Sequence, residues 1–519
     1  MGGAVIVLFF IAFFYLVYKN IAKANQYWKV RGVPYVSPRF FFGNFASNIF
    51  QKASFGDVLR TIYLAFPTER FVGLYQFTQP VLMVRDPELI KRITVKDFEY
   101  FSDHTQYIAP DVDPLWGRNL FSLSVKDGWH DMRTMLSPTF TSSKMRIIFS
   151  LMQECVKEFV SYLNTKGDTM TLELKDTFSR VANDIIGTTA FGVECNSLKN
   201  RHNEFYMMGK QITSFSGIRG LKFFAYATLP KLMKYLNVKL ISTTAAKFFT
   251  DVITDTLRYR EKNNVIRPDM LYLLTEVRKE RMAQGENSAN VKHHKIELTD
   301  DLITAQAMIF FFAGFDTVST ALSLMFYELA INSQIQDELF AEIRQTVGEQ
   351  ITYEKLLSMK FLDCVVSESL RLHPPGIFMD RRCVKPYVIE PEKARDPTVR
   401  LEKGDLIWIP IRELHRDPNN YPEPKKFDPG RFSSANKDQI NPFTFLPFGL
   451  GPRNCIASRF ALLECKLVLV EVLKQYEVVP VSKTEIPLTL SKKSPIPLPE
   501  NGVWVGFNRR VEDNRYSNE

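Results

Sequence analysis

The sequence predicts a mainly α-helical fold with small β-sheets (α+β), preceded by one transmembrane helix. Three features predict it: an uncharged apolar run over residues 1–18, helical periodicity over most of 128–348, and strand-like stretches at 71–74, 81–84 and 504–507. The 519 residues are 45% hydrophobic and include 42 phenylalanines. The chain can therefore bury a large core and enclose an apolar cavity.

The apolar run at the N-terminus predicts a membrane anchor. Eighteen helical residues span roughly 27 Å, which is close to the hydrocarbon thickness of a bilayer. Basic residues follow this run, whereas a cleaved signal peptide carries them in front, so the rest of the chain is expected in the cytosol. We expect an anchor at 1–18, a basic, proline-containing linker at 19–38 and a single catalytic domain at 39–519. The basic residues are Lys19, Lys23, Lys29 and Arg31.

The charge and the cysteine content exclude several classes of protein. A net charge of +9 suits an anionic membrane surface or an acidic protein partner. No basic run is interleaved with aromatic residues, which argues against nucleic acid as a partner. The six cysteines form no CxxC pair, which argues against a zinc site and against the disulfide framework of a secreted protein.

A glycine-rich loop that ends in a cysteine carries the strongest chemical signal. Residues 448–457 read FGLGPRNCIA and precede a run with helical periodicity. The glycines let the backbone turn tightly and approach a flat ring, and the N-terminus of the next helix favours a thiolate at Cys455. Arg453 is placed to pair with a negative group. An ordinary buried thiol is the alternative. However, residues of the types of Phe448, Gly451, Arg453 and Cys455 fall at this spacing by chance in about one chain in a thousand.

The apolar segment 308–320, MIFFFAGFDTVST, contains a glycine, an acid and a threonine in succession. Gly314 costs about 1 kcal/mol relative to Ala inside a helix, and Asp316 is out of place on a phenylalanine-rich surface. Thr317 can donate a hydrogen bond to the carbonyl four residues earlier, which helps to open the helix to water. The alternative is a kinked core helix with a satisfied threonine.

Two further pairs of residues have helical spacing. Glu368 and Arg371 lie at i,i+3 among apolar neighbours, and Arg431 follows downstream. An exposed ion pair is the common explanation of such a pair, but the neighbours favour burial. Trp129 and Arg133 lie at i,i+4 and offer two donors to one carboxylate.

Together these segments resemble the cytochrome P450 family over essentially the whole chain. Within the family, the strings RGVPY, FGVECNSL and PFGLGPRNC are nearest to microsomal insect enzymes of the detoxification type. Ala457 stands where the family's cysteine loop ends in glycine. The resemblance implies the cytochrome P450 fold and four sets of roles: Cys455 as the axial ligand of the haem iron; Phe448, Gly451, Arg453, Trp129, Arg133, Ala313 and Gly314 around haem b; Thr317 and Asp316 in oxygen activation; and Glu368, Arg371 and Arg431 as a structural triad.

The resemblance also implies a reaction and a location. It implies a monooxygenase of the endoplasmic reticulum membrane that inserts one oxygen atom of O₂ into apolar molecules such as plant toxins, insecticides, terpenoids or lipids. Electrons would come from NADPH through NADPH-cytochrome P450 reductase. Two alternatives stay open: a haem-thiolate isomerase or dehydratase, and a haem gas sensor without turnover. Asp316 and Thr317 argue against the isomerase.

By the same resemblance, the substrate pocket draws on five segments, and a basic surface meets the reductase. Which of Arg381 and Arg382 meets a haem propionate is left open. The pocket segments are 104–121, 215–226, the phenylalanines at 311, 312 and 315, 377–379 and 495–498. The reductase residues are Lys126, Lys144, Arg146 and Lys466.

Overall fold

The structure, a computed structural model, describes residues 2–214, 217–287, 297–348, 350–392, 396–493 and 497–510. It is mainly helical with small sheets, which confirms the expected fold class. The helices are α1 (Gly2–Ala24), α2 (Tyr27–Val30), α3 (Ala46–Ile49), α4 (Phe55–Ala65), α5 (Pro87–Lys91), α6 (Pro114–Gly117), α7 (Trp129–Leu136), α8 (Ser142–Asn164), α9 (Leu174–Ile186), α10 (Glu204–Thr213), α11 (Gly217–Thr228), α12 (Pro230–Tyr235), α13 (Thr243–Asn263), α14 (Met270–Asn287), α15 (Asp300–Ile331), α16 (Ser333–Val347), α17 (Tyr353–Ser358), α18 (Lys360–Leu372), α19 (Ile411–His415) and α20 (Ser458–Leu473). The strands are β1 (Phe71–Gln76), β2 (Gln79–Val84), β3 (Thr169–Glu173), β4 (Met379–Arg382), β5 (Tyr387–Ile389), β6 (Val399–Leu401), β7 (Leu406–Ile409), β8 (Tyr476–Val479) and β9 (Trp504–Arg509).

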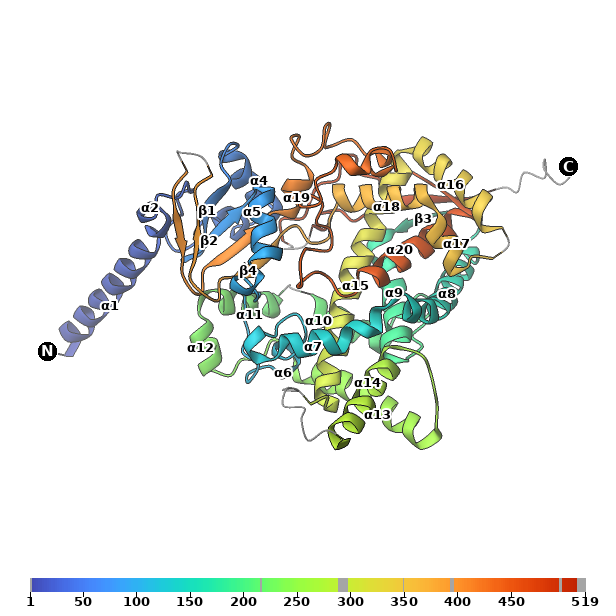
Figure 1. The fold of residues 1–519 in the computed structure, drawn as a ribbon, viewed down its shortest axis with the longest axis horizontal. Helices are drawn as coiled ribbons and strands as arrows, with labels where there is room; N and C mark the ends of the chain where they lie inside the picture. Colours follow the sequence, from blue (N-terminus) through green and yellow to red (C-terminus); the bar gives the residue numbers. More distant parts are fainter. Residues whose placement is uncertain are drawn as a thin grey trace, which may run out of the picture.

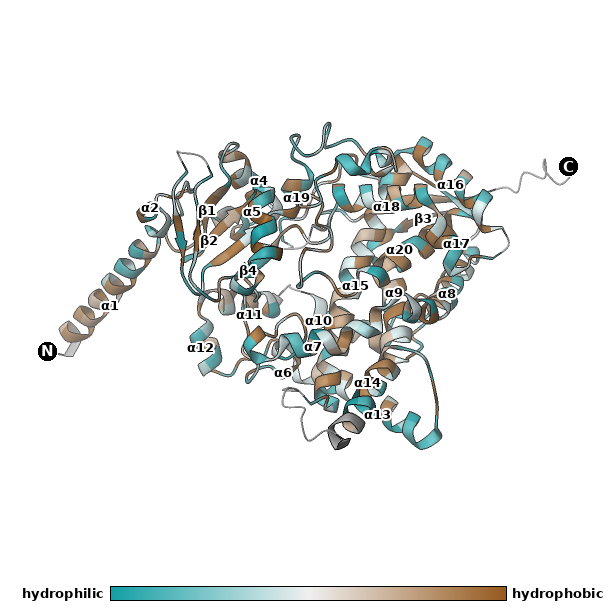
Figure 2. Ribbon diagram, viewed as in Figure 1, coloured by the Kyte–Doolittle hydropathy of each residue, from teal (hydrophilic) through white to brown (hydrophobic). Residues whose placement is uncertain are grey.

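The helix α1 projects away from the body of the molecule (Figure 1), and its surface is apolar (Figure 2). The stretch Ala4–Ala24 is long and apolar enough to cross a membrane, and almost all of its 18 most apolar residues lie outside the protein interior. The other helix that passes this test, α15, is mostly buried and is therefore a core helix. Helix α1 continues from Lys19 to Ala24, so the first part of the expected linker is helical.

A four-stranded sheet with the order β1-β2-β7-β4 joins α1 to the body. Strands β2 and β7 are parallel, and the other neighbours are antiparallel. Trp28 of α2 is fully buried, and its indole Nε1 donates to the carbonyl of Leu74 at 3.0 Å. A side chain at Gly73 would meet Trp28 at 2.5 Å, so only glycine lets β1 lie this close to α2. This packing fixes where α1 leaves the body of the molecule.

The long helix α15 runs through the middle of the body (Figure 1) and organises the core. The Thr299 side chain caps its N-terminus by accepting from the N–H of Leu302 at 3.3 Å, and two acidic residues occupy its first turn. It packs against α9, α6, α20, α10 and α13. Because it is apolar on all sides, it can be stable only in the interior.

A second sheet, with the order β3-β9-β8, packs against α15 through β8 and β9. The expected C-terminal strand is β9, which pairs antiparallel with both of its neighbours. Strand β3 interrupts the region expected to be helical, because its residues pair with a strand more than 300 positions away along the chain.

Candidate active site at the cysteine loop

The loop before α20 is held by its own backbone. The N–H of Cys455 donates to the carbonyl of Phe448 at 2.8 Å, and the N–H of Asn454 donates to the carbonyl of Gly451 at 3.0 Å. Gly451 has φ +75°, and a side chain there would lie 1.9 Å from the carbonyl oxygen of Thr94. Glycine is therefore required at this position, both for its backbone conformation and for space.

Cys455 differs from the other five cysteines. It is exposed, whereas the others are buried or half-buried. Burial nevertheless raises the pKa of the Cys455 thiol, while the N–H of Ala457 and the charge of Arg133 act in the opposite direction. The sulfur is thus enclosed by protein but reachable by a small molecule, which is the setting of an internal binding site. A bound metal cation would favour the thiolate there.

Three arginines make contacts at the loop: Arg453, which belongs to it, and Arg133 and Arg381, which come from distant parts of the chain. The Arg133 guanidinium donates to the backbone and side-chain oxygens of Asn454 at 2.9 and 2.8 Å. Arg453 lies 4.1 Å from the ring centre of the buried Trp129 and donates to the carbonyls of Ser102 and Leu123 at 2.8 and 2.7 Å. Burial lowers the pKa of Arg453 to about 9.

Arg453 also forms an ion pair with Asp103, which lies 3.5 Å away. Arg381 is buried and donates to the carbonyls of Asp380 and Leu450 at 2.8 and 3.0 Å. Its buried Nε has no hydrogen-bond partner within the part of the chain that the structure describes. Arg382 is exposed instead. A buried donor of this kind fits a carboxylate ligand, and it favours Arg381 over Arg382 as the residue that meets a propionate.

The segment of α15 that carries the glycine, the acid and the threonine has two distinct faces. Ala313 and Thr317 are exposed on a helix whose other residues are mostly buried, and the Thr317 hydroxyl donates to the Ala313 carbonyl at 2.5 Å, as expected. A side chain at Gly314 would meet Ile186 of α9 at 2.7 Å, so this glycine permits close packing of the two helices. The helix is continuous through this segment.

Asp316 points at α9 and is bound by a lysine that sequence reasoning missed. The Lys175 ammonium donates to the Asp316 carboxylate at 2.7 Å, to the Asp316 carbonyl at 3.2 Å and to the hydroxyl of Ser319 at 2.6 Å. Burial lowers the pKa of Lys175, and Asp316 opposes this effect. No pattern in the sequence could have found Lys175, because it lies 141 positions from Asp316.

Glu368, Arg371 and Arg431 come together as expected. Arg371 donates to both carboxylate oxygens of Glu368 at 2.7 and 2.8 Å, and both side chains are fully buried. Arg431 lies 3.5 Å from the same carboxylate, which also accepts from the N–H of Asp428 at 2.8 Å. Burial raises the pKa of Glu368, and Arg371 opposes the increase.

The buried imidazole of His415 connects this cluster to the approach of the cysteine loop. It contacts the Arg371 carbonyl through Nδ1 at 3.1 Å and accepts from the N–H of Leu446 through Nε2 at 2.8 Å. Burial lowers the pKa of His415 to about 3, so the ring is neutral at pH 7. A neutral ring can donate from Nδ1 and accept at Nε2 at the same time. Sequence reasoning gave His415 no role.

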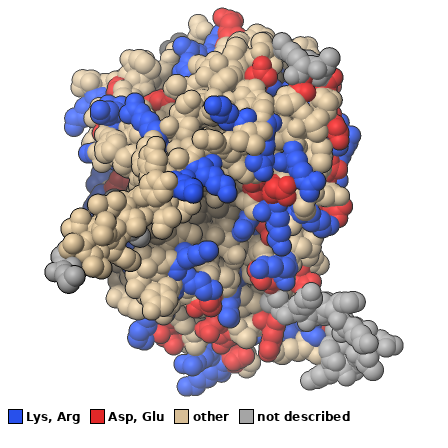
Figure 3. Space-filling model, turned by 90° about the vertical axis from the view of Figure 1, so that its left-hand side faces the viewer, with Lys and Arg blue, Asp and Glu red and all other residues tan. Residues whose placement is uncertain are grey.

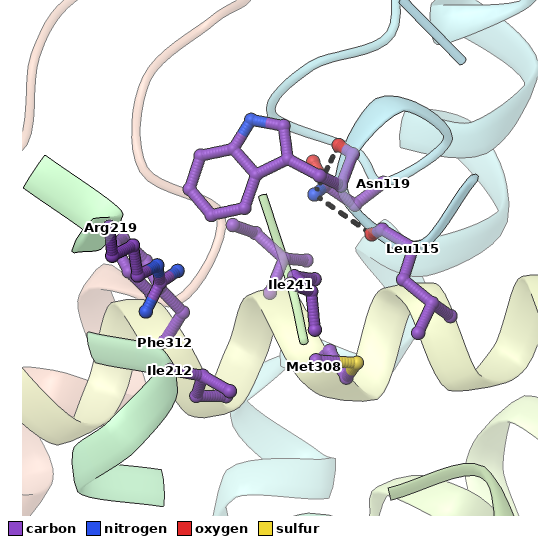
Figure 4. Close-up of a pocket in the computed structure, with 9 residues that line it drawn as sticks. Leu115, Asn119, Ile212, Arg219, Ile241, Met308 and Phe312 are labelled. Carbon is purple, nitrogen blue, oxygen red and sulfur yellow. Dashed lines mark hydrogen bonds between the residues drawn. The ribbon is translucent and has the colours of Figure 1, made fainter. Parts of the chain in front are cut away.

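A small cavity, with room for about one water molecule, borders α15 on the N-terminal side of Ala313. Its apolar walls include Leu115 and Trp116 of α6, Ile212 of α10 and Met308, Ile309 and Phe312 of α15 (Figure 4). Asn119 and Arg219 add polar groups. The expected segments 104–121 and 215–226 and the expected Phe312 contribute, whereas the expectation missed Ile212, Ile241, Met308 and Ile309. Residues 215, 216, 495 and 496 of the expected pocket lie outside the described residues.

Comparisons with known proteins show the family of the chain. A family model described as Cytochrome P450 matches residues 35–505. The chain is 45% identical to Cytochrome P450 9e2 of Blattella germanica, over 97% of this chain and 98% of that relative. It is 40% identical to Probable cytochrome P450 9f2 of Drosophila melanogaster, over 95% and 97% of the two chains. It is 37% identical to Cytochrome P450 6k1 of Blattella germanica, over 94% of each. The chain therefore belongs to the cytochrome P450 family.

Proposed function

We propose that this chain is a membrane-anchored haem-thiolate monooxygenase that oxidises apolar small molecules with O₂ and with electrons from NADPH through NADPH-cytochrome P450 reductase. The observation that carries the proposal is the Cys455 thiol, which is enclosed by protein, reachable by a small molecule and close to Arg133. Haem b held by Cys455 supplies the reduction of O₂ and the transfer of one oxygen atom to the substrate. The free donor of Arg381 and the exposed Ala313 and Thr317 fit this group.

Thr317 and Asp316 control protons in this proposal. Because the Thr317 hydroxyl donates its hydrogen bond to the Ala313 carbonyl, its oxygen can accept a hydrogen bond from a group on the exposed face of α15. The Asp316 carboxylate is held by Lys175, so it must turn away from α9 before it can carry a proton toward Thr317. Lys175 is then a positioning residue, and its ammonium sets the orientation from which Asp316 starts.

Location in the endoplasmic reticulum membrane, with the domain in the cytosol, is supported by α1 and its surroundings. The apolar side chains of α1 are largely exposed; Phe9, for example, is 70% exposed. Lys and Arg side chains gather on the face of the molecule from which α1 emerges (Figure 3). An exposed apolar helix beside basic side chains suits a bilayer with anionic headgroups.

The reductase is proposed to approach the side of the molecule on which Cys455 lies. The structure corrects one residue of the surface expected to meet it. Lys466 is buried and forms an ion pair with Asp363, so it cannot meet a partner. Arg146 is exposed, although it is paired with Glu354 at 2.8 Å. Lys126 is exposed and Lys144 is half-buried.

The haem ligand can be tested with a matched pair of cysteine variants. Cys455→Ser should abolish the red-shifted Soret band of the thiolate-ligated ferrous carbonyl complex, because serine does not supply a thiolate. Cys465→Ser is the control, since Cys465 is buried on α20 outside the loop. A normal band in Cys455→Ser would refute the ligand assignment.

Turnover separates the monooxygenase from the two alternatives. The full-length protein with its reductase should consume NADPH and O₂ and release an oxygenated product. Product formation from a hydroperoxide without reductase would indicate an isomerase or dehydratase, and haem binding without any product would indicate a gas sensor.

A further inference from the structure

The imidazole of His104 lies near Arg381, the arginine whose donor fits a haem carboxylate. The segment that carries His104 runs along β4, at the edge of the four-stranded sheet: the N–H of Arg382 donates to the carbonyl of Asp103 at 2.7 Å. The His104 ring is stacked on Phe121, with 4.6 Å between the ring centres, and its side chain is only 11% exposed. The protein therefore holds a titratable ring in a fixed place beside the expected cofactor site.

Asp380 of β4 determines which nitrogen of this imidazole carries hydrogen. Its carboxylate lies 2.8 Å from Nδ1 of His104 and accepts from the N–H of Thr105 at 2.6 Å. Although burial acts in the opposite direction, His104 and these hydrogen bonds hold the pKa of Asp380 well below its usual range. An ionised carboxylate can only accept, so Nδ1 donates to Asp380. Nε2 is then the nitrogen that gains a proton when the ring becomes charged.

The charged groups that face His104 act on its protonation in opposite directions. Burial lowers the pKa of His104, Asp380 opposes this effect, and the cations Arg381 of β4 and Arg453 of the cysteine loop strengthen it. Asp103, which precedes His104 in the chain, lies 3.5 Å from Arg453 and offsets part of its charge. Two cations beside a desolvated imidazole disfavour a further positive charge. A negative group that paired with these arginines would remove much of that repulsion.

We propose that His104 is a positioning residue that takes up a proton from water when haem binds, so that haem affinity rises as the pH falls. This inference rests on the proposed function, because it takes haem as the source of the carboxylate that pairs with Arg381. The buried Nε of Arg381 has no hydrogen-bond partner within the described residues and can receive that carboxylate. With Arg381 balanced, the pKa of His104 rises. Protonated His104 and Asp380 then form an ion pair that fastens the segment to β4.

The direction of the pH effect follows from proton linkage. A protein that gains a proton on binding binds its ligand more tightly at lower pH, by about tenfold for each unit by which binding raises the pKa. Cys455 acts in the opposite direction, because its thiol must lose a proton to become a ligand. His104→Gln should remove the first contribution and keep the second. The ratio of the wild-type affinity to the variant affinity therefore isolates the contribution of His104.

The test is a competition for haem between the full-length, haem-loaded protein and apomyoglobin, followed by the Soret band. It runs from about pH 8.5 to about pH 5.5, a range that includes the ordinary pKa of histidine. The ratio of wild-type to His104→Gln affinity should rise by at least about threefold over this range, which corresponds to a pKa of His104 that haem raises by about half a unit.

Two further variants complete the test. Asp380→Asn keeps the imidazole but removes the countercharge of the imidazolium, so the contribution of His104 should move to lower pH or disappear from this range. His202→Gln is the matched control: His202 is an exposed histidine on the loop before α10. Its replacement should leave the affinity at every pH within about twofold of the wild type, since exposed histidines far from ligands seldom change binding.

A ratio that stays constant over the pH range would overturn the proposal, because it would make His104 a purely structural residue. A ratio that falls toward acid pH would overturn it as well. If His104→Gln does not fold, Asp380→Asn decides the question: a pH dependence identical to that of the wild type would refute the role of the pair. A wild-type chain without a Soret band at any pH would refute the proposed function and this inference with it. A normal band with a constant ratio would refute this inference alone.

Discussion

Replacing Arg371 with methionine tests how the buried ion pair holds the region of the cysteine loop. The substitution keeps much of the side-chain volume and removes two hydrogen bonds to Glu368 and three to the carbonyls of His415, Pro424 and Lys426. It leaves Glu368 in the core without its main partner. Breaking a fully buried pair from one side costs about 3–5 kcal/mol, a large part of the 5–15 kcal/mol by which domains are typically stable.

The expected shift in melting temperature follows from the length of the chain. With about 2.1 cal/mol/K of unfolding entropy per residue, 519 residues give roughly 1 kcal/mol/K. A loss of about 4 kcal/mol therefore corresponds to roughly 4 °C. The assay is urea and thermal unfolding of the haem-loaded protein, followed by the Soret band.

Two further variants make the reasoning about Arg371 refutable. Glu368→Gln combined with Arg371→Met should recover part of the loss, because it removes the uncompensated charge. Arg146→Met is the matched control, since Arg146 and Glu354 form an ion pair of similar length in which the side chains are 64% and 60% exposed. It should cost less than about 1 kcal/mol. If Arg371→Met unfolds no earlier than Arg146→Met, the buried pair does not stabilise the domain.

Three other predictions concern protons and the membrane. Thr317→Ala should lower the ratio of product to NADPH consumed, by up to about 10²-fold, and raise hydrogen peroxide, whereas unchanged coupling would make Thr317 only a cap for the Ala313 carbonyl. Lys175→Met should slow product formation on the order of tenfold, as expected when a supporting partner is lost, and should add little to Asp316→Asn in the double variant; full additivity would show that the two residues act separately. Deletion of residues 2–18 should release much of the protein from membranes in a fractionation assay and keep the haem spectrum, because Trp28 and the following sheet remain; an unchanged membrane-bound fraction would contradict the anchor.

The sequence alone allowed prediction of those features whose residues lie close together along the chain. The loop around Cys455 depends on glycine conformations and on a helix that begins three residues later, so its pattern is visible in ten consecutive residues. The prediction of an anchor depends only on length and apolarity, and the bond from Thr317 to Ala313 depends only on helical spacing. Glu368 and Arg371 could likewise be paired by their helical spacing and their apolar neighbours.

Tertiary structure alone decided which side chains meet from distant elements. The sequence placed Asp316 beside Thr317, but the fold turns its carboxylate toward Lys175 on α9, and it buries Lys466, which the sequence placed on the reductase surface. It also distinguished the buried Arg381 from the exposed Arg382 and brought Arg219 into a cavity with α15. Each of these depends on contacts between segments tens to hundreds of residues apart. Burial and charge pairing are properties of such contacts, and no period or motif along the chain encodes them.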